Sequence, residues 1–245
     1  TLITDNLFDG VVIKLGRKFS NISLLGDDVI IAGSAVTDKA LSDFAINNNL
    51  SGFEFLSCIP GTVGGGIKMN AGCYGKYTSD YFVSAKAVNR SGDLVKLEKS
   101  DVLFSYRNTD LPTDLVVVEV PFAPPLVEVD RLHEKMRLQK EKRDGEQPTN
   151  DITAGSTFRN PCGYSSSGAV NENHNLKAWK VIEDAGLRGF TMGAAKMHEK
   201  HPNFLTNIGG STASELEKLG ELVRKKVFQN SGIDLQWEII RVGDP

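Results

Sequence analysis

The fold of this chain is decided by the stretch Ile59-Pro60-Gly61-Thr62-Val63-Gly64-Gly65-Gly66-Ile67-Lys68-Met69-Asn70-Ala71-Gly72-Cys73-Tyr74-Gly75. Glycine loses more backbone entropy on ordering than any other residue, so we predict that this stretch does not form a stable helix. Its successive backbone N–H groups are open to close approach, which suits an anionic group such as a diphosphate. The spacing matches neither the Rossmann nor the phosphate-loop fingerprint. Glycine richness alone favours an ordinary loop, so an anion-binding glycine loop of another kind is a hypothesis that the order of the other residues must support.

The composition indicates an ordinary folded protein without a basic surface field. The chain has 245 residues, 40% of them hydrophobic, and a net charge of -3. This length allows one large domain or two small ones, and the charge argues against nucleic acid or an anionic membrane as partner. No apolar run is long enough to cross a bilayer, and Thr1-Leu2-Ile3-Thr4-Asp5-Asn6 lacks the apolar core of a signal peptide. We expect a cytoplasmic monomer whose partners are small molecules.

The cysteines and histidines indicate neither a disulfide framework nor a metal site. Cys58, Cys73 and Cys162 are an odd number without C-x-x-C spacing, which fits a reducing compartment. We expect Cys58 and Cys73 to be small buried residues beside the glycine loop. His198 and His201 lie close in sequence but lack further ligands. No metal is predicted.

The first half of the chain predicts several strands and one helix. Thr37 is a typical N-cap, and the apolar spacing after it predicts a helix from Asp38 to Ala45. Runs of apolar residues predict the strands: Val11–Leu15, Val29–Gly33, a hairpin of Ala85–Arg90 and Leu94–Leu97 around a glycine turn, and Leu115–Val120, which Pro121 closes.

After Pro124-Pro125 the chain becomes heavily charged, and we place a domain boundary there, with domains 1–125 and 126–245. Residues 129–143 predict a solvated helix. The rest of the second domain predicts a loop at Gly155–Phe158, a flexible surface loop at Ser165–Gly168, a helix at Ala178–Ala185 ended by Gly186, a long helix after Ser211 with a Thr212/Glu215 capping box, and an alternating strand at Ile233–Val242.

The order of the other residues in the opening stretch, Pro-Gly-Thr-Val-Gly-Gly, then Met-Asn-Ala-Gly, then Tyr-Gly, resembles the flavin loop of the vanillyl-alcohol-oxidase-like FAD proteins. Distant motifs narrow the resemblance: Phe104-Ser105-Tyr106-Arg107, Ala154-Gly155-Ser156-Thr157-Phe158-Arg159-Asn160-Pro161 and Leu235-Gln236-Trp237-Glu238-Ile239-Ile240. Almost from end to end, the chain is similar to the UDP-N-acetylenolpyruvoylglucosamine reductase (MurB) family. The resemblance implies an α+β fold: a vanillyl-alcohol-oxidase/PCMH-like FAD-binding domain, followed by a C-terminal α+β substrate-binding domain.

The resemblance also implies the reaction. This is the reduction of the enolpyruvyl double bond of UDP-N-acetylglucosamine enolpyruvate to UDP-N-acetylmuramate, in peptidoglycan precursor synthesis, with FAD as cofactor and NADPH as reductant. Negative charge that develops beside the substrate carboxylate needs preorganised donors. By position in the matching motifs, Arg107 would hold or polarise the carboxylate. Glu238, if protonated, would donate a hydrogen bond to the enolate. Ser156 would donate a proton to the carbanion carbon.

Further site residues follow from the same resemblance. For FAD they are Gly33, Ala35, Gly61, Thr62, Val63, Gly64, Asn70 and Gly72. For the UDP-sugar they are Tyr106, Arg159, Asn160 and Lys180. Arg159 stands where the family commonly has lysine, which keeps the charge but changes the hydrogen-bond geometry. The substrate is expected between the two domains, as at many domain interfaces.

The chain departs from the family pattern in three places. A segment like Thr1–Asp5 normally follows a strand-helix-strand unit and a Gly-x-Gly-Ser-Asn loop, so we expect an N-terminally truncated flavin domain with weaker FAD binding and an unpaired sheet edge. Between Arg107 and Ser156 there is no room for an extra substrate-closing loop, which favours the shorter subtype, type II. The stretch from Cys162 to Asn175 is longer than expected and has no assigned chemical role.

Other interpretations stay open at this point. A serine after glycine is most often a turn residue, a lone arginine usually lies on the surface, and a glutamate on a terminal strand usually faces water. Two other functions are an oxygen-using FAD-linked oxidase of the same fold and a non-catalytic UDP-sugar-binding module. Reduction of the flavin by NADPH, and sensitivity to a change at Ser156, would separate the reductase from both.

Overall fold

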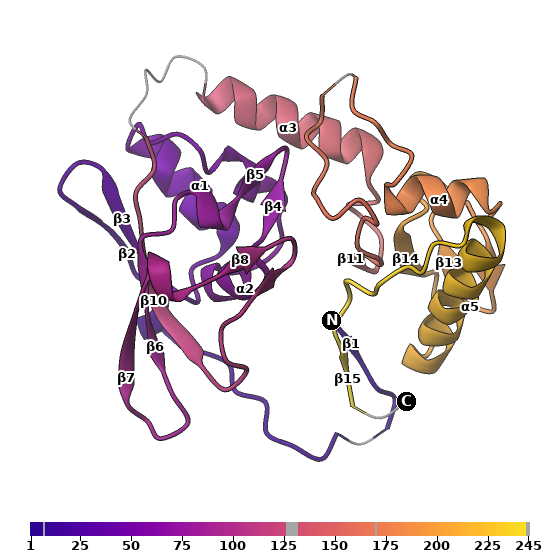
Figure 1. Ribbon diagram of the computed structural model, residues 1–245, viewed down its shortest axis with the longest axis horizontal. Helices are drawn as coiled ribbons and strands as arrows, with labels where there is room; N and C mark the ends of the chain where they lie inside the picture. Colours follow the sequence, from indigo (N-terminus) through magenta and orange to yellow (C-terminus); the bar gives the residue numbers. More distant parts are fainter. Residues whose placement is uncertain (7, 126–131, 170, 244–245) are drawn as a thin grey trace. The chain divides into compact units, whose positions relative to one another are not determined.

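The computed structural model describes residues 1–245 except residues 7, 126–131, 170 and 244–245. The chain forms two compact units (Figure 1). We call Ile13–Lys142 with Ser165–Ala169 the glycine-loop unit, and Thr1–Val12, Arg143–Tyr164 and Val170–Pro245 the terminal unit. The predicted domain boundary between residues 125 and 126 falls where the described residues stop, and it stays a prediction.

The glycine-loop unit is built on a five-stranded sheet of order β2-β3-β10-β6-β7, with every neighbouring pair antiparallel. Its strands are β2 (Ile22–Leu25), β3 (Val29–Gly33), β6 (Ser84–Val88), β7 (Leu94–Glu98) and β10 (Val116–Phe122). The strand predicted at Val29–Gly33 and the hairpin predicted around its glycine turn are confirmed. The central strand β10 carries a bulge between Val117 and Glu119.

Pro121 lies inside β10 and does not close it, so that prediction was wrong. Proline is tolerated here because the ladder between β10 and β6 has already ended at Glu119 and Lys86. Beyond that point the Pro121 carbonyl still accepts a hydrogen bond from the Val83 N–H at 3.2 Å. The missing N–H therefore interrupts no regular ladder.

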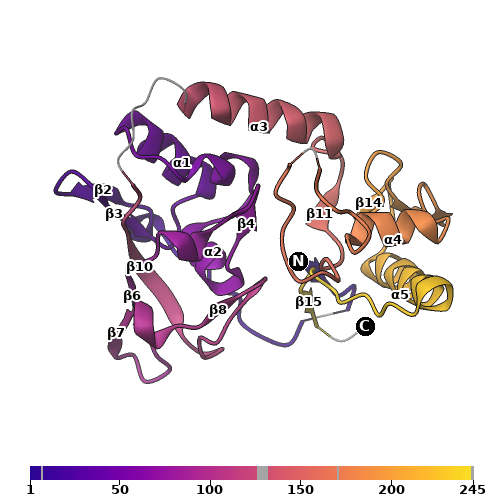
Figure 2. The same ribbon diagram turned by 45° about the horizontal axis from the view of Figure 1, so that its top comes forward.

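Helices α1 (Asp38–Asn47) and α2 (Val63–Met69) and the 3-10 turn η2 (Glu54–Cys58) pack with the sheet around one apolar core (Figure 2). The predicted N-cap is confirmed, because Thr37 Oγ1 accepts the Ala40 N–H at 3.1 Å. In α2 the glycine stretch is helical at Val63–Met69, contrary to our prediction. Burial of Val63 and Ile67 in the core outweighs the entropic cost of the glycines between them.

Short elements complete the glycine-loop unit. Two small hairpins are β4 (Gly72–Cys73) with β5 (Lys76–Tyr77), and β8 (Phe104–Ser105) with β9 (Asn108–Thr109). The 3-10 turns are η1 (Arg17–Phe19), η3 (Thr78–Asp80) and η4 (Lys99–Asp101). The charged helix α3 (Leu132–Glu146) begins in this unit, and the start predicted at residue 129 lies outside the described residues.

The strand predicted at Val11–Leu15 does not form. Val11, Val12 and Ile13 are exposed at 86%, 83% and 82%, and no described strand pairs with them. A strand needs the backbone groups of a neighbour, so an apolar run of the right length is not sufficient. The prediction was wrong because no described strand pairs with this segment.

The terminal unit has a four-stranded antiparallel sheet of order β11-β14-β13-β12, covered by two helices. The strands are β11 (Thr153–Ser156), β12 (Thr191–Met192), β13 (Ala195–Met197) and β14 (Phe204–Asn207), and the helices are α4 (Ala178–Asp184) and α5 (Ala213–Ser231). The capping box of Thr212 and Glu215 is confirmed. Leu219, Val223 and Val227 of α5 are fully buried in the second apolar core.

Two predictions in this unit need correction. The sequence Gly155–Phe158 is not a simple loop, because Ser156 ends strand β11, which is bulged at Gly155 with φ +87°. The predicted strand at Ile233–Val242 is broken into an isolated bridge at Trp237 and the short β15 (Arg241–Val242), which pairs with β1 (Leu2–Ile3). In the described residues no helix is long and apolar enough to cross a membrane.

Candidate functional site

The glycine loop presents backbone donors. The N–H groups of Val63 and Gly64 donate to Val36 and Ser34 carbonyls at 2.9 Å. In contrast, the N–H groups of Gly61, Thr62 and Gly65 have no hydrogen-bond partner among the described residues. Gly61 and Gly65 are exposed and Thr62 is half-buried, so their N–H groups are open to approach from outside the protein. These three donors are therefore the part of the loop that can receive an anionic ligand.

The turn that follows β3 shapes the loop from below. A Cβ at Gly33 would lie 2.1 Å from the Phe19 carbonyl oxygen, and a Cβ at Gly64 would lie 3.0 Å from the Ser34 Cβ. The N–H groups of Gly33 and Ala35 donate to backbone carbonyls of Asn21 and Phe19. Gly33 and Ala35 thus hold the turn in place with their backbones, and the Ser34 side chain lies against Gly64 of the loop.

Two polar side chains in this turn were not among the site residues predicted from the sequence. Ser34 is 2% exposed, and its hydroxyl has no hydrogen-bond partner within the described part of the chain. Asp38 is also 2% exposed, and desolvation by burial raises the pKa of its carboxyl to about 7. Both residues are candidates only because they lie close to the glycine loop, and this closeness in space is not visible in the sequence.

Asn70 connects the loop to the motif that contains Arg107. It caps α2 in the left-handed conformation, with φ 42°. Its side-chain amide donates to the Ser105 carbonyl at 3.0 Å, and its oxygen accepts the Ser79 N–H at 3.2 Å. Both ends of the amide therefore hold protein groups, so the observed role of Asn70 is to tie α2 to the β8–β9 hairpin.

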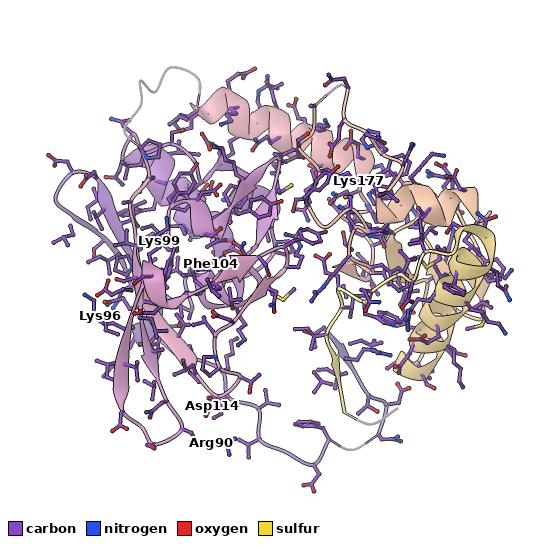
Figure 3. All side chains as sticks on the ribbon, in the orientation of Figure 1. Arg90, Lys96, Lys99, Phe104, Asp114 and Lys177 are labelled. Atoms are coloured by element: carbon purple, nitrogen blue, oxygen red, sulfur yellow. The ribbon has the colours of Figure 1, made fainter. Side chains whose placement is uncertain are left out.

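Arg107 lies at the turn of that hairpin, in the left-handed conformation with φ 55°. Its guanidinium donates to the Gly72 carbonyl at 3.0 Å and lies 5.2 Å from the centre of the Tyr106 ring. The hairpin is anchored by Phe104, labelled in Figure 3, whose ring packs edge-on against Phe82 at 5.1 Å. The predicted catalytic arginine is thus docked directly on the predicted flavin loop.

A segment from the long 162–175 stretch reaches the same carbonyl. Ser165 is 5% exposed, its hydroxyl donates to Gly72 at 3.2 Å, and its N–H donates to the Tyr77 hydroxyl at 3.0 Å. Nearby, Lys142 donates to the Gly168 carbonyl at 3.1 Å. The predicted surface loop at Ser165–Gly168 is therefore wrong for Ser165, which is buried because its polar atoms find partners in the glycine-loop unit.

In the terminal unit the structure brings Ser156 and Glu238 onto paired segments. Phe158 and Trp237 form an antiparallel bridge, and the Glu238 N–H donates to the Thr157 carbonyl at 2.8 Å. Ser156 and Glu238 are half-buried. The Ser156 hydroxyl has no hydrogen-bond partner among the described residues, so it is available to a ligand.

Thr157 and Asn203 fix the Ser156 segment against residues 203–205. Thr157 is fully buried, and its hydroxyl accepts the Leu205 N–H at 2.9 Å. The Asn203 side chain bonds both the N–H and the carbonyl of Phe158, at 3.0 and 2.9 Å. A buried amide with two backbone partners holds one geometry. Neither residue was among our sequence-based site residues.

The predicted substrate residues of this unit have different surroundings. Arg159 keeps a buried Nε without a partner in the described part of the chain. The Asn160 amide accepts the Ala178 N–H at 3.1 Å and donates to the Tyr164 carbonyl at 3.0 Å. Lys180 pairs with Asp184 one helical turn on. Of the three, Arg159 is the best placed to need a ligand.

Lys177, labelled in Figure 3, is a buried cation that the sequence analysis did not mention as a site residue. Its ammonium pairs with Glu172 at 2.8 Å and lies 4.1 Å from the centre of the Tyr164 ring. Both partners belong to the long stretch between Cys162 and Asn175, so the pair holds its two ends to α4. In the described residues no group of three or more His, Cys, Asp or Glu side chains could hold a metal ion.

Comparison with family models divides the chain in the same order. Residues 1–98 match the FAD binding domain, and residues 147–242 match the C-terminal domain of UDP-N-acetylenolpyruvoylglucosamine reductase. The first match contains the glycine loop and the turn below it. The second contains Ser156 and Glu238.

Individual relatives agree. The chain is 52% identical over 244 residues to UDP-N-acetylenolpyruvoylglucosamine reductase of Jannaschia sp. (strain CCS1), covering 100% of this chain and 78% of the relative. It is 50% identical to the enzyme of the same name from Paracoccus denitrificans (strain Pd 1222), with 100% and 79% coverage. The crystal structure of the Thermus caldophilus reductase superposes with a TM-score of 0.82 at 25% identity, covering 99% of this chain and 82% of that one. With its glycine loop, its docked arginine and its paired Ser156 and Glu238 segments, the chain belongs to the UDP-N-acetylenolpyruvoylglucosamine reductase family.

Proposed function

We propose that Arg107, Ser156 and Glu238 carry the reduction of UDP-N-acetylglucosamine enolpyruvate to UDP-N-acetylmuramate in this chain. The chain is a flavoprotein oxidoreductase of peptidoglycan synthesis by family. The observation that carries the proposal is the placement of Ser156, which has a free hydroxyl on a segment hydrogen-bonded to Glu238. A turn serine without a catalytic role would need no such pairing.

The residues of the glycine-loop unit fit FAD. Three loop N–H groups have no partner among the described residues, the buried Ser34 hydroxyl is also unsatisfied there, and a Cβ at Gly64 would press on the Ser34 side chain at 3.0 Å. Gly61, Thr62 and Gly65 would hold the diphosphate through their backbones, with Gly33, Ala35, Val63, Asn70 and Gly72 shaping the loop. When bound, FAD accepts a hydride from NADPH and passes it to the enolpyruvyl double bond.

Arg107 would bind the substrate carboxylate. Its guanidinium is already oriented by Gly72 and by the Tyr106 ring, so little freedom is lost when a ligand arrives. A planar fork can bind a carboxylate through two parallel hydrogen bonds, and it stabilises the charge that moves onto that carboxylate during the reaction. Each such preorganised donor is worth roughly 3 kcal/mol.

Ser156 and Glu238 would act on the carbon skeleton. The Ser156 hydroxyl would hand its proton to the carbon beside the carboxylate, because a carbanion is basic enough to take a proton from an alcohol. Glu238, as a carboxylic acid, would donate a hydrogen bond to the enolate oxygen. Thr157 and Asn203 hold the Ser156 segment against residues 203–205 while this happens.

Arg159 would take the remaining negative charge of the UDP-sugar. Its buried Nε has no partner within the described residues, and a guanidinium suits a phosphate. We assign Tyr106, Asn160 and Lys180 to the substrate as well, on their positions in the family motifs. We further propose a cytoplasmic monomer with a domain boundary near residue 125. Three free cysteines support the cytoplasmic location, and family models that end at residue 98 and resume at 147 support the boundary.

Separate half-reactions of Ser156→Ala test the proposal. NADPH should still bleach the flavin at the normal rate, whereas reoxidation by the enolpyruvyl sugar should slow by roughly 10²-fold to 10⁴-fold, as expected for the loss of a general acid. Ser156→Cys should restore part of the rate, because a thiol also carries a proton. Ser79→Ala, remote in sequence from the motif, serves as the matched control.

The outcome decides between the three functions. Equal loss in both half-reactions would contradict a proton-donor role for Ser156. Flavin that NADPH does not reduce, but that oxygen reoxidises after an alcohol substrate, would indicate the oxidase. Binding of the UDP-sugar without any retained flavin, unchanged in Ser156→Ala, would indicate the binding module.

A further inference from the structure

Asp38 is the first residue of α1 and lies directly beneath the glycine loop. It is 2% exposed. A Cβ at Gly61 would lie 2.5 Å from one Asp38 carboxylate oxygen, and a Cβ at Gly66 would lie 3.6 Å from the other. The Asp38 N–H also donates to the Gly61 carbonyl at 3.1 Å. The carboxyl is therefore enclosed between two glycines of the flavin loop.

No described cation balances this carboxyl. On the elements packed against α1, Glu54 of η2 pairs with Lys135 of α3, and Lys68 of α2 donates to the Leu111 and Pro112 carbonyls. Asp80 of η3, beside α2, accepts the Tyr77 N–H, and on α1 itself Lys39 pairs with Asp43. Burial alone raises the pKa of Asp38, to about 7. Near neutral pH the carboxyl is thus easily protonated.

A diphosphate would bring further negative charge to the same loop. One unpartnered N–H group belongs to Gly61, against which Asp38 packs, and another belongs to Gly65, which directly precedes Gly66, the second of these glycines. An ionised Asp38 would repel the incoming anion across one layer of backbone, because its buried carboxylate is poorly screened by water. A neutral Asp38 would not. The charge of this side chain should therefore be linked to occupation of the loop.

We propose that FAD binds to this chain together with one proton, taken from the solvent and held on the Asp38 carboxyl. The proposal rests on the assignment of the loop to FAD. It makes Asp38 a positioning residue for the cofactor that the family motifs do not include, and it predicts that the affinity for FAD falls as the pH rises.

The test is the pH dependence of FAD binding to the intact chain. For wild type, the dissociation constant should rise up to tenfold per pH unit above about pH 7, because one proton is taken up on binding. Asp38→Asn, which is always neutral, should bind FAD with a nearly constant dissociation constant. Asp43→Asn, an exposed carboxyl on the same helix, is the matched control and should keep the wild-type slope.

Calorimetry supplies a readout that does not depend on activity. FAD titrations at about pH 8 in two buffers of different ionisation enthalpy should show uptake of about one proton in wild type and none in Asp38→Asn. If Asp38→Asn does not fold, the carbon resonance of the Asp38 carboxyl in the wild-type chain gives the same answer. Its titration midpoint should lie near pH 7 without ligand and move upward with FAD.

Equal pH slopes in wild type and Asp38→Asn, a fixed Asp38 resonance on FAD addition, or no FAD binding at any pH would each overturn the proposal. These outcomes differ from failure of the proposed reaction. Proton-coupled FAD binding by a chain whose flavin NADPH never reduces would leave this inference standing and remove the proposed function. Normal half-reactions with pH-independent FAD binding would remove this inference and leave the proposed function standing.

Discussion

The two units build their candidate sites from different parts of the chain. In the glycine-loop unit the ligand-facing groups are backbone N–H groups of Gly61, Thr62 and Gly65, and the side chains around them mainly hold the backbone in place. In the terminal unit they are side chains, Ser156 and Arg159 above all, on a backbone fixed by buried polar groups. A backbone site should fail when any Cβ is added. A side-chain site should fail when one particular functional group is lost.

The units also carry opposite buried titratable groups. The glycine-loop unit encloses an acid, Asp38, and the terminal unit encloses a base, His201. Burial raises the pKa of Asp38 to about 7, while burial, reinforced by the charge of Arg188, lowers the pKa of His201 to about 4. Burial favours the neutral form of each group. The acid is neutral at low pH and the base at high pH, so the stability of the two units depends on pH in opposite directions.

The largest expected effect is the pH dependence of stability in the glycine-loop unit. Below its unfolded pKa of 3.8, Asp38 is protonated in both states, so the unit is at full stability. As the pH rises from there to about 7 only the unfolded chain ionises, and roughly 4 kcal/mol of stability is lost. Hydrogen exchange of β3 amides between about pH 4 and about pH 8 measures this loss, and Asp38→Asn should abolish it. A flat profile in wild type would contradict it.

The terminal unit should show the reverse sign. Above about pH 6.5 His201 is neutral in both states, and as the pH falls toward 4 the unfolded chain alone takes up a proton. The folded unit then loses roughly 3 kcal/mol. Both tryptophans, Trp179 and Trp237, lie in this unit, so tryptophan fluorescence in urea follows it selectively. His201→Gln should remove the loss of stability at acidic pH. Parallel pH profiles of stability for the two units would contradict the opposite signs predicted here.

The next effect sharpens the contrast between backbone and side-chain construction. Gly33→Ala should cost roughly 3 kcal/mol or more, because its Cβ would lie 2.1 Å from a backbone oxygen that cannot rotate away. Gly220→Ala in α5 would meet the Trp237 ring, also at 2.1 Å, but a side chain can shift. We expect a loss of roughly 1–3 kcal/mol there. Denaturant midpoints measure both.

Gly16→Ala is the matched control for this comparison, since a Cβ there meets nothing within 4 Å. It should leave the free energy of unfolding nearly unchanged. If Gly220→Ala cost more than Gly33→Ala, the distinction between the two kinds of site would be wrong.

Much of the fold was predictable because local rules agree with the tertiary structure. Thr37 and Thr212 cap helices where the sequence places them, and the hairpin at Gly92 forms as its turn residues require. The failures are tertiary. Helix α2 forms despite three glycines because Val63 and Ile67 are buried, and Val11–Leu15 forms no strand because nothing described pairs with it. Neither the burial nor the missing partner is a property of the local sequence.

The candidate site shows the same limit. Motifs predicted Arg107, Ser156 and Glu238 as site residues, because spacing and residue type survive in the sequence. They did not identify Asp38 or Ser34, whose importance comes from contact with a loop more than twenty residues away in the chain. Asn70 was assigned to the cofactor, whereas both ends of its amide hold protein backbone. A motif predicts that a residue belongs to a site, but it does not show which atoms of that residue already have hydrogen-bond partners within the protein.

The smallest expected effect concerns Ser165, where a side chain supports the backbone-built site. Its hydroxyl and the Arg107 guanidinium donate to the same Gly72 carbonyl, at 3.2 and 3.0 Å. Ser165→Ala removes one of the two donors, at a cost of about 1 kcal/mol. Arg107 keeps its own hydrogen bond, so kcat/KM for the enolpyruvyl sugar should fall only about fivefold. The rate of flavin reduction by NADPH should stay normal.

Ser166→Ala, the neighbouring serine without a hydrogen bond to the glycine loop, is the control and should behave as wild type. A large loss in Ser165→Ala, comparable with that of Ser156→Ala, would mean that the 165–169 segment takes part in the chemistry itself. The backbone-built site would then depend on one functional group after all, and the two units would differ less than their structures indicate. No effect at all would show that the orientation of Arg107 does not depend on Ser165.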